Sequence, residues 1–183
     1  GEGFRVKGAP NEAVLYDRVL FATPAPTTAR LLPALSPAAS AALKKVKLAG
    51  SVVVGFKFDS DTDPEGNRLP DNTGILVGTD QEDVHAKAFT LSSRKWPHLA
   101  ERGGALVRAS FGRYGDDALL RAEEEQLVDY ALDDLQHITG FDGRAAGVSE
   151  IFTQRWFGGI PRYDETHLAT VAAAHAALAD VPG

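Results

Sequence analysis

The sequence predicts an α+β fold built mainly from an antiparallel sheet. Three or four strand-like segments follow Gly50 with short connections, which favours an antiparallel meander. A long stretch after residue 116 has the apolar periodicity of an amphipathic helix. A second helical stretch, rich in alanine, comes near the end of the chain. Strands and helices of this kind are typical of the α+β class.

The first 43 residues predict short strands followed by short helical segments. Strands are expected over 3–6, 13–15 and 17–22, and the sequence NEA between the first two suits a hairpin turn. A helical turn over 27–32 is interrupted by Pro33. A helix then begins at Ser36, the expected N-cap, with Pro37 at its first position.

The middle of the chain predicts the sheet. The sequence SVVVGFKF is the strongest strand, because β-branched and aromatic residues favour a pleated, half-buried surface. The polar stretch DSDTDPEGNRLPDNTG is a loop. Further strands are expected at ILVG, HAKAFTLSS and RGGALVRASFG.

The last third predicts a helix, a strand and a helix. One helix is expected over 116–138, with acidic residues early and Gly140 as its stop. Its apolar stripe comprises Leu120, Leu127, Val128, Ala131, Leu132, Leu135 and Ile138. VSEIFTQRWF is a strand. The final helix starts at Asp164 or Thr166 and is closed by Pro182 and Gly183.

Composition limits the classes of function. The 183 residues, 44% of them hydrophobic, suffice for one ordinary domain or two small ones. A net charge of -6 provides no field to collect phosphates, so nucleic acid is not an expected partner. The absence of cysteine excludes disulfides, thiolate metal sites and thiol catalysis. The absence of cysteine also fits a reducing cytoplasm, which is the expected location. No apolar run has the length of a membrane span, and no signal peptide is found at Gly1. Because the sequence also lacks methionine, we expect an internal piece of a longer protein.

Several short motifs favour a structural interpretation over a functional one. The loop containing Asp59, Asp61 and Asp63 spaces its acids like a calcium site, but prolines stand at its sixth and twelfth positions. Ser92-x-x-Lys95 has the spacing of penicillin-recognising enzymes without their partner motifs. The five histidines have no short metal-ligand spacing, and His175 suits a packed or surface position. No metal site and no catalytic side chain is predicted.

Two stretches invite a functional interpretation. VLFATPAP ends a buried strand on a small residue and a proline, either as a tight turn or to admit something flat against the backbone. RWFGGIPRY gathers aromatics, two glycines, a proline and a phenol. The alternative for the second stretch is a buried aromatic anchor at a strand end.

The order of these pieces resembles the protoporphyrinogen/coproporphyrinogen III oxidase family of the flavin monoamine-oxidase superfamily. The segment GFRVKGAPNEAVLYDRVLFATPAPTTARLLPALSP resembles the late hairpin and flavin-side strand of its FAD domain. AFTLSSRKWPHLA, ALVRASFGR and RWFGGIPRYDETHLATVAAAHAAL are similar to the later parts of the family. The family's closing pattern is matched by Arg155, Trp156, Pro161, Tyr163 and His167. The sequence departs from it at Arg162, where glutamine is common, and at Thr166, where glycine is common.

The resemblance implies a division into three parts. Residues 1–35 would belong to an FAD-binding domain as a strand hairpin and flavin-side strand. Residues 36–156 would form a substrate-binding domain, with helices packed on one face of the sheet. Residues 157–183 would return toward the FAD domain. The glycine-rich fingerprint for the FAD pyrophosphate is not present in these residues.

The resemblance also implies a function for the parent protein in haem biosynthesis. The reaction would oxidise a porphyrinogen to a porphyrin, with hydride transfer from a meso carbon to FAD and reoxidation by dioxygen. Ala22, Thr23, Pro24 and Trp156 are the expected cofactor contacts. Pro161, Arg162 and Tyr163 are the expected substrate contacts, with Arg162 facing a carboxylate. An alanine- and arginine-rich composition, typical of high-GC bacteria, favours coproporphyrinogen III over protoporphyrinogen IX.

Further expectations concern the chain by itself. We expect it to be inactive, to hold no FAD, and to self-associate through the surface that the FAD domain would cover. A peripheral membrane contact of the parent is left open. Two other classes also stay open: a piece of another flavin amine oxidase or desaturase, and a non-enzymatic binding module on the same fold.

Overall fold

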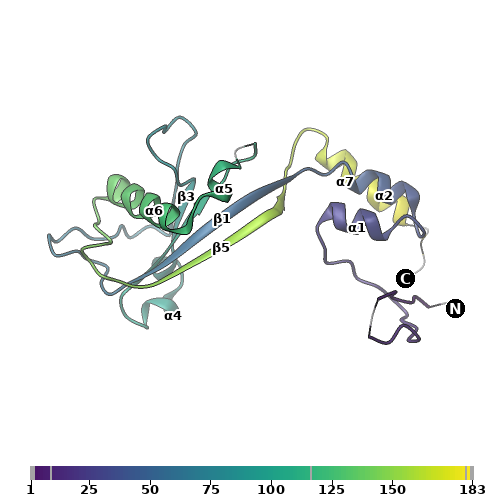
Figure 1. Cartoon of the computed structure of the whole chain (residues 1–183), viewed down its shortest axis with the longest axis horizontal. Coiled ribbons are helices and arrows are strands. Elements are labelled where there is room, and N and C mark those ends of the chain that lie inside the picture. The colour runs from purple at the N-terminus through teal and green to yellow at the C-terminus, as the bar shows by residue number, and fades with distance from the viewer. Residues whose placement is uncertain (1–2, 9, 116, 180, 182–183) are drawn as a thin grey trace. The chain divides into compact units, whose positions relative to one another are not determined.

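The computed structural model describes residues 3–8, 10–115, 117–179 and 181 (Figure 1). The chain divides into two compact units. One unit consists of residues 1–48 and 161–183, and the other of residues 49–160. The predicted assignment of residues 1–35, 36–156 and 157–183 to FAD-side and substrate-side parts stays a prediction.

The unit of residues 49–160 is built on a five-stranded sheet with the order β2-β3-β4-β1-β5. The pairs β1–β4, β2–β3 and β3–β4 are antiparallel, which confirms the predicted mainly antiparallel sheet. Figure 1 shows β1 and β5 as the two long strands of this sheet. The strands are β1 (Leu48–Phe58), β2 (Gly74–Leu76), β3 (Ala88–Leu91), β4 (Ala105–Phe111) and β5 (Val148–Pro161).

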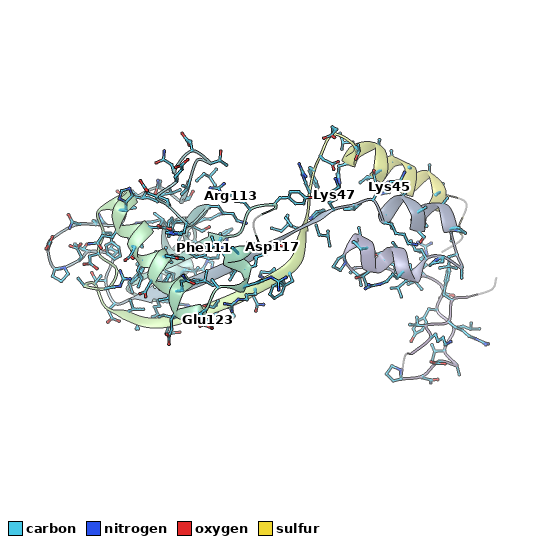
Figure 2. The ribbon with its side chains drawn as sticks, turned by 45° about the horizontal axis from the view of Figure 1, so that its top comes forward. Lys45, Lys47, Phe111, Arg113, Asp117 and Glu123 are labelled. Carbon is cyan, nitrogen blue, oxygen red and sulfur yellow. The ribbon has the colours of Figure 1, made fainter. Side chains whose placement is uncertain are left out.

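Alternation along the strands gives the sheet one buried face. On β1 the side chains of Val52, Val54 and Phe58 are fully buried, as a period of two residues requires. Val107 and Ala109 of β4 face the same core. Phe58 fills its centre by stacking on the ring of Phe56 and meeting the ring of Phe141 edge-on. Phe111, labelled in Figure 2, is also fully buried in this core.

Helices cover the buried face. The main one is α6 (Glu124–Thr139), which contributes Leu127, Ala131, Leu132 and Leu135 to the same core as the strands. It ends at Gly140, whose φ of 77° is left-handed, so the predicted glycine stop is confirmed. Of the smaller helices, α5 (Ala118–Arg121) adds Leu120 to this core, whereas α3 (Ser92–Lys95) and α4 (Pro97–Ala100) have no buried residue and do not contribute to it.

The single helix predicted over 116–138 is wrong, because the chain forms two helices there; residue 116 itself lies outside the described residues. Helix α5 ends at Arg121, and both Ala122 and Glu123 have extended backbone with ψ near 150°. The guanidinium of Arg155 on β5 donates to the carbonyl oxygens of Leu120 and Ala122. These carbonyl groups therefore find a partner outside the helix, and the helix need not continue to satisfy them.

The strand predicted over HAKAFTLSS is shorter than expected. It ends at Leu91, and Ser92 and Ser93 begin helix α3 instead. The hydroxyl of Ser93 accepts a hydrogen bond of 3.1 Å from the backbone N–H of Leu106 on β4. A side chain that bonds to a neighbouring backbone in this way offers an alternative to the regular strand ladder.

The other unit contains three helices: α1 (Ala25–Leu31), α2 (Pro37–Leu43) and α7 (His167–Leu178). The predicted N-cap is confirmed, because the hydroxyl of Ser36 accepts from the N–H of Ala39 at 3.2 Å. The same hydroxyl donates to the carbonyl oxygen of Ala177 on α7. The hydroxyl of Ser40 donates to the carbonyl oxygen of Ala29 on α1, so α2 is tied to both neighbours.

The strand hairpin predicted near the start is reduced to a single antiparallel bridge between Phe4 and Tyr16. None of the expected strands over 3–6, 13–15 and 17–22 forms among the described residues. An isolated pair of strands is marginal without a further strand or an apolar face to pack on. At the other end, helix α7 has Thr166 as its N-cap, and the predicted closing residues Pro182 and Gly183 lie outside the described residues.

Candidate functional site

The face of the sheet opposite α6 carries a groove of about 610 Å³. Its floor is formed by β1 and β4, where Gly55 pairs with Arg108. One wall is formed by Phe152 and Trp156 of β5, whose side chains are 66% and 55% exposed. Large aromatics at this exposure on one face indicate a surface for binding, because isolated apolar side chains are common but gathered ones are not.

Charged groups lie in the groove as well. Lys57 and Glu150 form an ion pair with an Nζ to Oε1 distance of 3.0 Å, so their charges offset one another. The guanidinium of Arg108 donates to the hydroxyl of Thr90 at 3.2 Å. Among the described residues, no carboxylate forms an ion pair with Arg108. The groove therefore combines an apolar wall with one cation that has no acidic partner.

This arrangement suits a flat, apolar molecule that carries a carboxylate. Ligand sites are mostly apolar clefts of roughly 300–1,000 Å³ with a few polar groups that fix orientation. An arginine can hold a carboxylate through two parallel hydrogen bonds. The groove offers both features on strands, which hold side chains more firmly than loops do.

Sequence reasoning found only one residue of this groove. Trp156 was predicted to contact a cofactor, and it lies in the groove wall; its cofactor role stays a prediction. Gly55, Arg108 and Phe152 were missed. Strand alternation was an available signal for Gly55 and Arg108, because each lies between buried neighbours on its strand. Phe152 had no such signal, because β5 contains no buried residue.

The predicted cofactor segment of residues 22–24 lies in the unit with the three helices. Ala22, Thr23 and Pro24 are exposed. The Thr23 carbonyl oxygen accepts from the hydroxyl of Thr28 at 3.1 Å, and the two threonine hydroxyls lie 2.8 Å apart. Thr28 is buried in the middle of α1. Thr23 is therefore held to helix α1 by hydrogen bonds, while the side chains of residues 22–24 are exposed to solvent.

The predicted substrate segment, Pro161 to Tyr163, is exposed in the same unit. The backbone N–H of Arg162 donates to the carbonyl oxygen of Lys47 at 2.8 Å. The Tyr163 ring stacks on the imidazole of His167 with centroids 4.1 Å apart. Figure 2 labels Lys47, whose ammonium lies 3.9 Å from a carboxylate oxygen of Asp164. These contacts orient the segment, while its site role stays a prediction.

Asp164 anchors the turn that follows. Its carboxylate accepts from both the hydroxyl and the backbone N–H of Thr166. The hydrogen bond from the Thr166 hydroxyl is the main cause that lowers the pKa of Asp164, and the Lys47 and Arg162 charges add to it. The hydrogen bonds from Thr166 to Asp164 therefore fix the turn that precedes α7.

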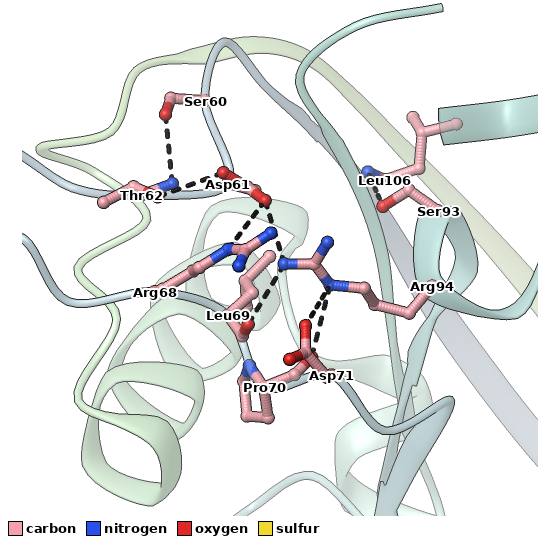
Figure 3. Close-up of polar contacts among 10 residues, drawn as sticks. All are labelled: Ser60, Asp61, Thr62, Arg68, Leu69, Pro70, Asp71, Ser93, Arg94 and Leu106. Atoms are coloured by element: carbon pink, nitrogen blue, oxygen red, sulfur yellow. Dashed lines mark hydrogen bonds and ion pairs between the residues drawn. The ribbon is translucent and has the colours of Figure 1, made fainter. Parts of the chain in front are cut away.

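The acidic loop over 59–71 is a structural element. Asp63 is buried and accepts hydrogen bonds from the backbone N–H groups of Glu65, Asn67 and Asp142. Figure 3 shows how Asp61 is held by the guanidinium groups of Arg68 and Arg94. Within the described part of the chain, no group of three or more acidic or histidine side chains could hold a metal ion.

The Ser92-x-x-Lys95 stretch contacts the same loop through Arg94. Arg94 pairs with Asp61 at 2.8 Å and also donates to the carbonyl oxygen of Leu69 (Figure 3). Ser93 is hydrogen-bonded to β4, as described above. His175, the other residue weighed from the sequence, is exposed on α7. No helix in the described parts of the chain is long and apolar enough to cross a membrane.

Comparison with known proteins identifies the family. Residues 1–177 match the family described as flavin containing amine oxidoreductase. The chain belongs to this family. The resemblance predicted from the sequence is thereby confirmed, and a flavin is the cofactor that membership implies.

Similar members of the flavin-containing amine oxidoreductase family carry a more specific name. Coproporphyrinogen III oxidase of Mycobacterium tuberculosis is 41% identical over 163 residues, which cover 88% of this chain and 33% of that protein. The Mycobacterium leprae protein of the same name is 37% identical over 88% of this chain and 34% of its own length. The chain thus spans about a third of the length of the curated relatives it matches.

Solved structures agree with the fold. A putative protoporphyrinogen oxidase from Exiguobacterium sp. 255-15 superposes with a TM-score of 0.67 at 26% identity, covering 88% of this chain and 33% of that one. Reduced UDP-galactopyranose mutase superposes with a TM-score of 0.56 at 11% identity, over 76% of this chain and 28% of its own. The second likeness concerns the fold alone.

The segment of residues 22–24 fits a flat cofactor on one side. Ala22 adds little bulk, and Pro24 has no N–H group that would lose a partner under a ring. The carbonyl and hydroxyl oxygens of Thr23 are already paired with Thr28. These residues can therefore form one wall for the isoalloxazine ring of a flavin. The sequence contains no glycine-rich loop for the pyrophosphate.

Proposed function

We propose that this chain is the substrate-holding part of an FAD-dependent oxidase that converts coproporphyrinogen III to the porphyrin. The observation that carries the proposal is the groove on the open face of the sheet, with aromatic walls and an arginine in its floor. Relatives named coproporphyrinogen III oxidase support the choice of substrate. Protoporphyrinogen IX, a smaller acid with two propionates, is the second candidate, supported by the name of the Exiguobacterium structure.

The residues of the chain would supply binding and orientation. Phe152 and Trp156 offer an apolar wall against which a tetrapyrrole can lie, and water is excluded from the covered ring face. Arg108 offers a cation to a propionate. When bound, FAD would supply a hydride acceptor: each two-electron step removes one hydride from a substrate carbon and one proton from the substrate, and dioxygen takes up the two electrons and two protons as hydrogen peroxide. The protein would raise the rate by positioning, because a substrate held beside the flavin reacts without a bimolecular encounter.

The contacts predicted from the sequence fit this role as proposals. Ala22, Thr23 and Pro24 would line the flavin, and Pro161, Arg162 and Tyr163 would contact the substrate. Trp156 lies in the groove wall, which suits contact with either group. None of these side chains is proposed as a general base.

The test is turnover by the full-length protein loaded with FAD. Coproporphyrinogen III and protoporphyrinogen IX, each freshly reduced, are supplied in air, and porphyrin fluorescence and hydrogen peroxide are followed together. We expect both signals with coproporphyrinogen III, and faster turnover than with protoporphyrinogen IX. Oxidation of amines or polyenes without porphyrin formation would support another flavin oxidase. No oxidation of any of these substrates by the flavin-loaded protein would favour a binding module.

A further inference from the structure

Arg108 is placed unusually for a surface arginine. It lies on β4, which is bonded to β3 on one side and β1 on the other, so its backbone is held in the interior of the sheet. Its side chain lines the groove rather than the rim of the unit. Thr90, its hydrogen-bond partner, is neutral, so this contact places no opposite charge beside the guanidinium. The planar fork still has donors to offer beyond the one that Thr90 accepts.

The residue opposite Arg108 on β1 is a glycine, which has no side chain. Gly55 is its direct neighbour on β1 in the register of the two strands. A methyl group built on Gly55 would lie 3.7 Å from the carbonyl oxygen of Phe152, an ordinary contact distance. The glycine is therefore not required by packing, and its φ is not left-handed. Its absent side chain leaves bare backbone between the guanidinium on β4 and the aromatic wall on β5.

The other charges of the groove leave Arg108 as the anion site. Lys57 is paired with Glu150 at 3.0 Å, and Glu150 would repel a carboxylate brought near that pair. Of the cations lining the groove, only Arg108 has no acidic partner among the described residues. A ligand carboxylate is thus directed to the Gly55 side of the groove, next to Arg108.

We propose that Arg108 binds a propionate of the tetrapyrrole and that the ring lies over Gly55, between Arg108 and Phe152. The inference rests on the proposed function for the class of ligand, but it names the residue that fixes the orientation of that ligand. A guanidinium and a carboxylate can form two parallel hydrogen bonds, so the contact fixes direction as well as distance. Arg108 is a binding and positioning residue here, and it takes no part in proton or hydride transfer.

The experiment measures binding separately from turnover. Isothermal titration of the full-length, flavin-loaded protein uses two ligands: coproporphyrin III, and its tetra-amide, in which every propionate is a neutral amide. Arg108→Gln should weaken coproporphyrin III binding roughly 10- to 100-fold, the usual loss for one charge-assisted pair. The same variant should leave tetra-amide binding within about twofold. Arg108→Lys should fall between, because an ammonium keeps the charge without the fork.

Two further variants complete the design. Arg144→Gln removes an equal charge from the helix side, where Arg144 pairs with Asp129 and Asp133, and should leave both ligands unaffected. Gly55→Val should weaken both ligands by filling the floor of the groove, while the β-branched side chain suits a strand and keeps the fold. Thermal melts of every variant show whether the protein is intact.

The outcomes separate the inference from the proposed function. If Arg108→Gln oxidises coproporphyrinogen III and binds coproporphyrin III as the wild type does, the role of Arg108 is refuted and the proposed function stands. Equal losses for the acid and the amide would also refute it, because they indicate a structural effect. Unchanged binding in Gly55→Val refutes the placement of the ring. A wild-type protein that binds neither ligand and oxidises no porphyrinogen refutes the proposed function itself.

Discussion

Replacement of Tyr163 distinguishes a functional role for this residue from a structural one. The side chain is 77% exposed and its main contact is the stack on His167, at 4.1 Å between centroids and 21° between planes. Burial of a whole aromatic side chain is worth about 3–5 kcal/mol on truncation to alanine. An exposed aromatic pair is worth about 0.5–1.5 kcal/mol. Tyr163→Ala should therefore lower the free energy of unfolding by no more than about 1.5 kcal/mol, and Tyr163→Phe by less still.

The kinetic effect is expected to be larger than the effect on stability. Tyr163→Phe keeps the stacked ring and removes only the hydroxyl. In the full-length, flavin-loaded protein it should change kcat or KM for coproporphyrinogen III several-fold, if the hydroxyl faces the substrate as the resemblance implies. Steady-state porphyrin fluorescence measures the kinetics, and thermal and urea unfolding measure stability. Tyr114→Phe, in the turn after β4, serves as the control and should have wild-type kinetics.

Two results would refute this reasoning. A loss of about 3 kcal/mol or more in Tyr163→Ala would mean that the ring is part of a packed core. Wild-type kinetics for both Tyr163 variants, with normal melting, would remove Tyr163 from the substrate site. The second result would leave the proposed function untouched, because the groove residues do not depend on it.

Three other predictions concern stability and cofactor binding. Asp134→Ala should lower the free energy of unfolding, measured in urea, by about 2–5 kcal/mol. The buried carboxylate accepts hydrogen bonds from the N–H groups of His85 and Ala86, and both groups would lose their partner. A loss below about 1 kcal/mol would contradict this prediction. The hydrogen bond from the N–H of Asp142 is the main cause that lowers the pKa of Asp63 below 3.8. The ionised Asp63 carboxylate therefore stabilises the folded state above that pH, and this contribution is lost as the pH falls through the pKa that Asp63 has in the folded protein. Urea midpoints from roughly pH 5 to roughly pH 2.5 should thus fall less steeply in Asp63→Asn, and parallel curves would argue against it. The 183-residue chain purified with added FAD should retain no stoichiometric flavin and show no oxidase activity, since it lacks a glycine-rich pyrophosphate loop; a flavin absorbance spectrum in the dialysed protein would show otherwise.

Much of the sheet could be predicted because its signal is local. The β-branched run of β1 and the alternation in β4 each indicate a strand within a few residues. The cap at Ser36 and the stop at Gly140 were also predictable, since one residue type at one position determines each. The order of these elements in turn supported the family resemblance.

The break between α5 and α6 could not be predicted from local signals. The predicted apolar stripe steps from Leu120 to Leu127 with no glycine or proline between them to end a helix, and the acidic residues Glu124 and Glu125 are only a weak sign that a new helix begins. The guanidinium that satisfies the carbonyl of Ala122 belongs to Arg155, 33 residues later in the chain. Long-range contacts of this kind override local propensity. The early hairpin failed for a related reason, because its strands find no sheet among the described residues of their unit.

The groove was hidden from the sequence because it draws on three strands at once. Gly55, Arg108 and Phe152 are far apart in sequence, and each is ordinary by itself. They meet only because β4, β1 and β5 are neighbours in the sheet and a period of two residues sends alternate side chains to the same face. A motif search along one strand cannot detect that combination.

The two faces of this sheet carry different tasks. The buried face, packed with α6, supplies the core, and its residues are fixed by volume, as the Phe58 contacts show. The open face contributes little to that core, so aromatic side chains such as Phe152 remain exposed there at a cost in solubility rather than stability. Substitutions on the open face should therefore alter ligand binding without unfolding the protein. Substitutions in the buried face should instead lower the free energy of unfolding. Because the two effects fall on different faces of the sheet, the role of Arg108 in binding can be tested without unfolding the protein.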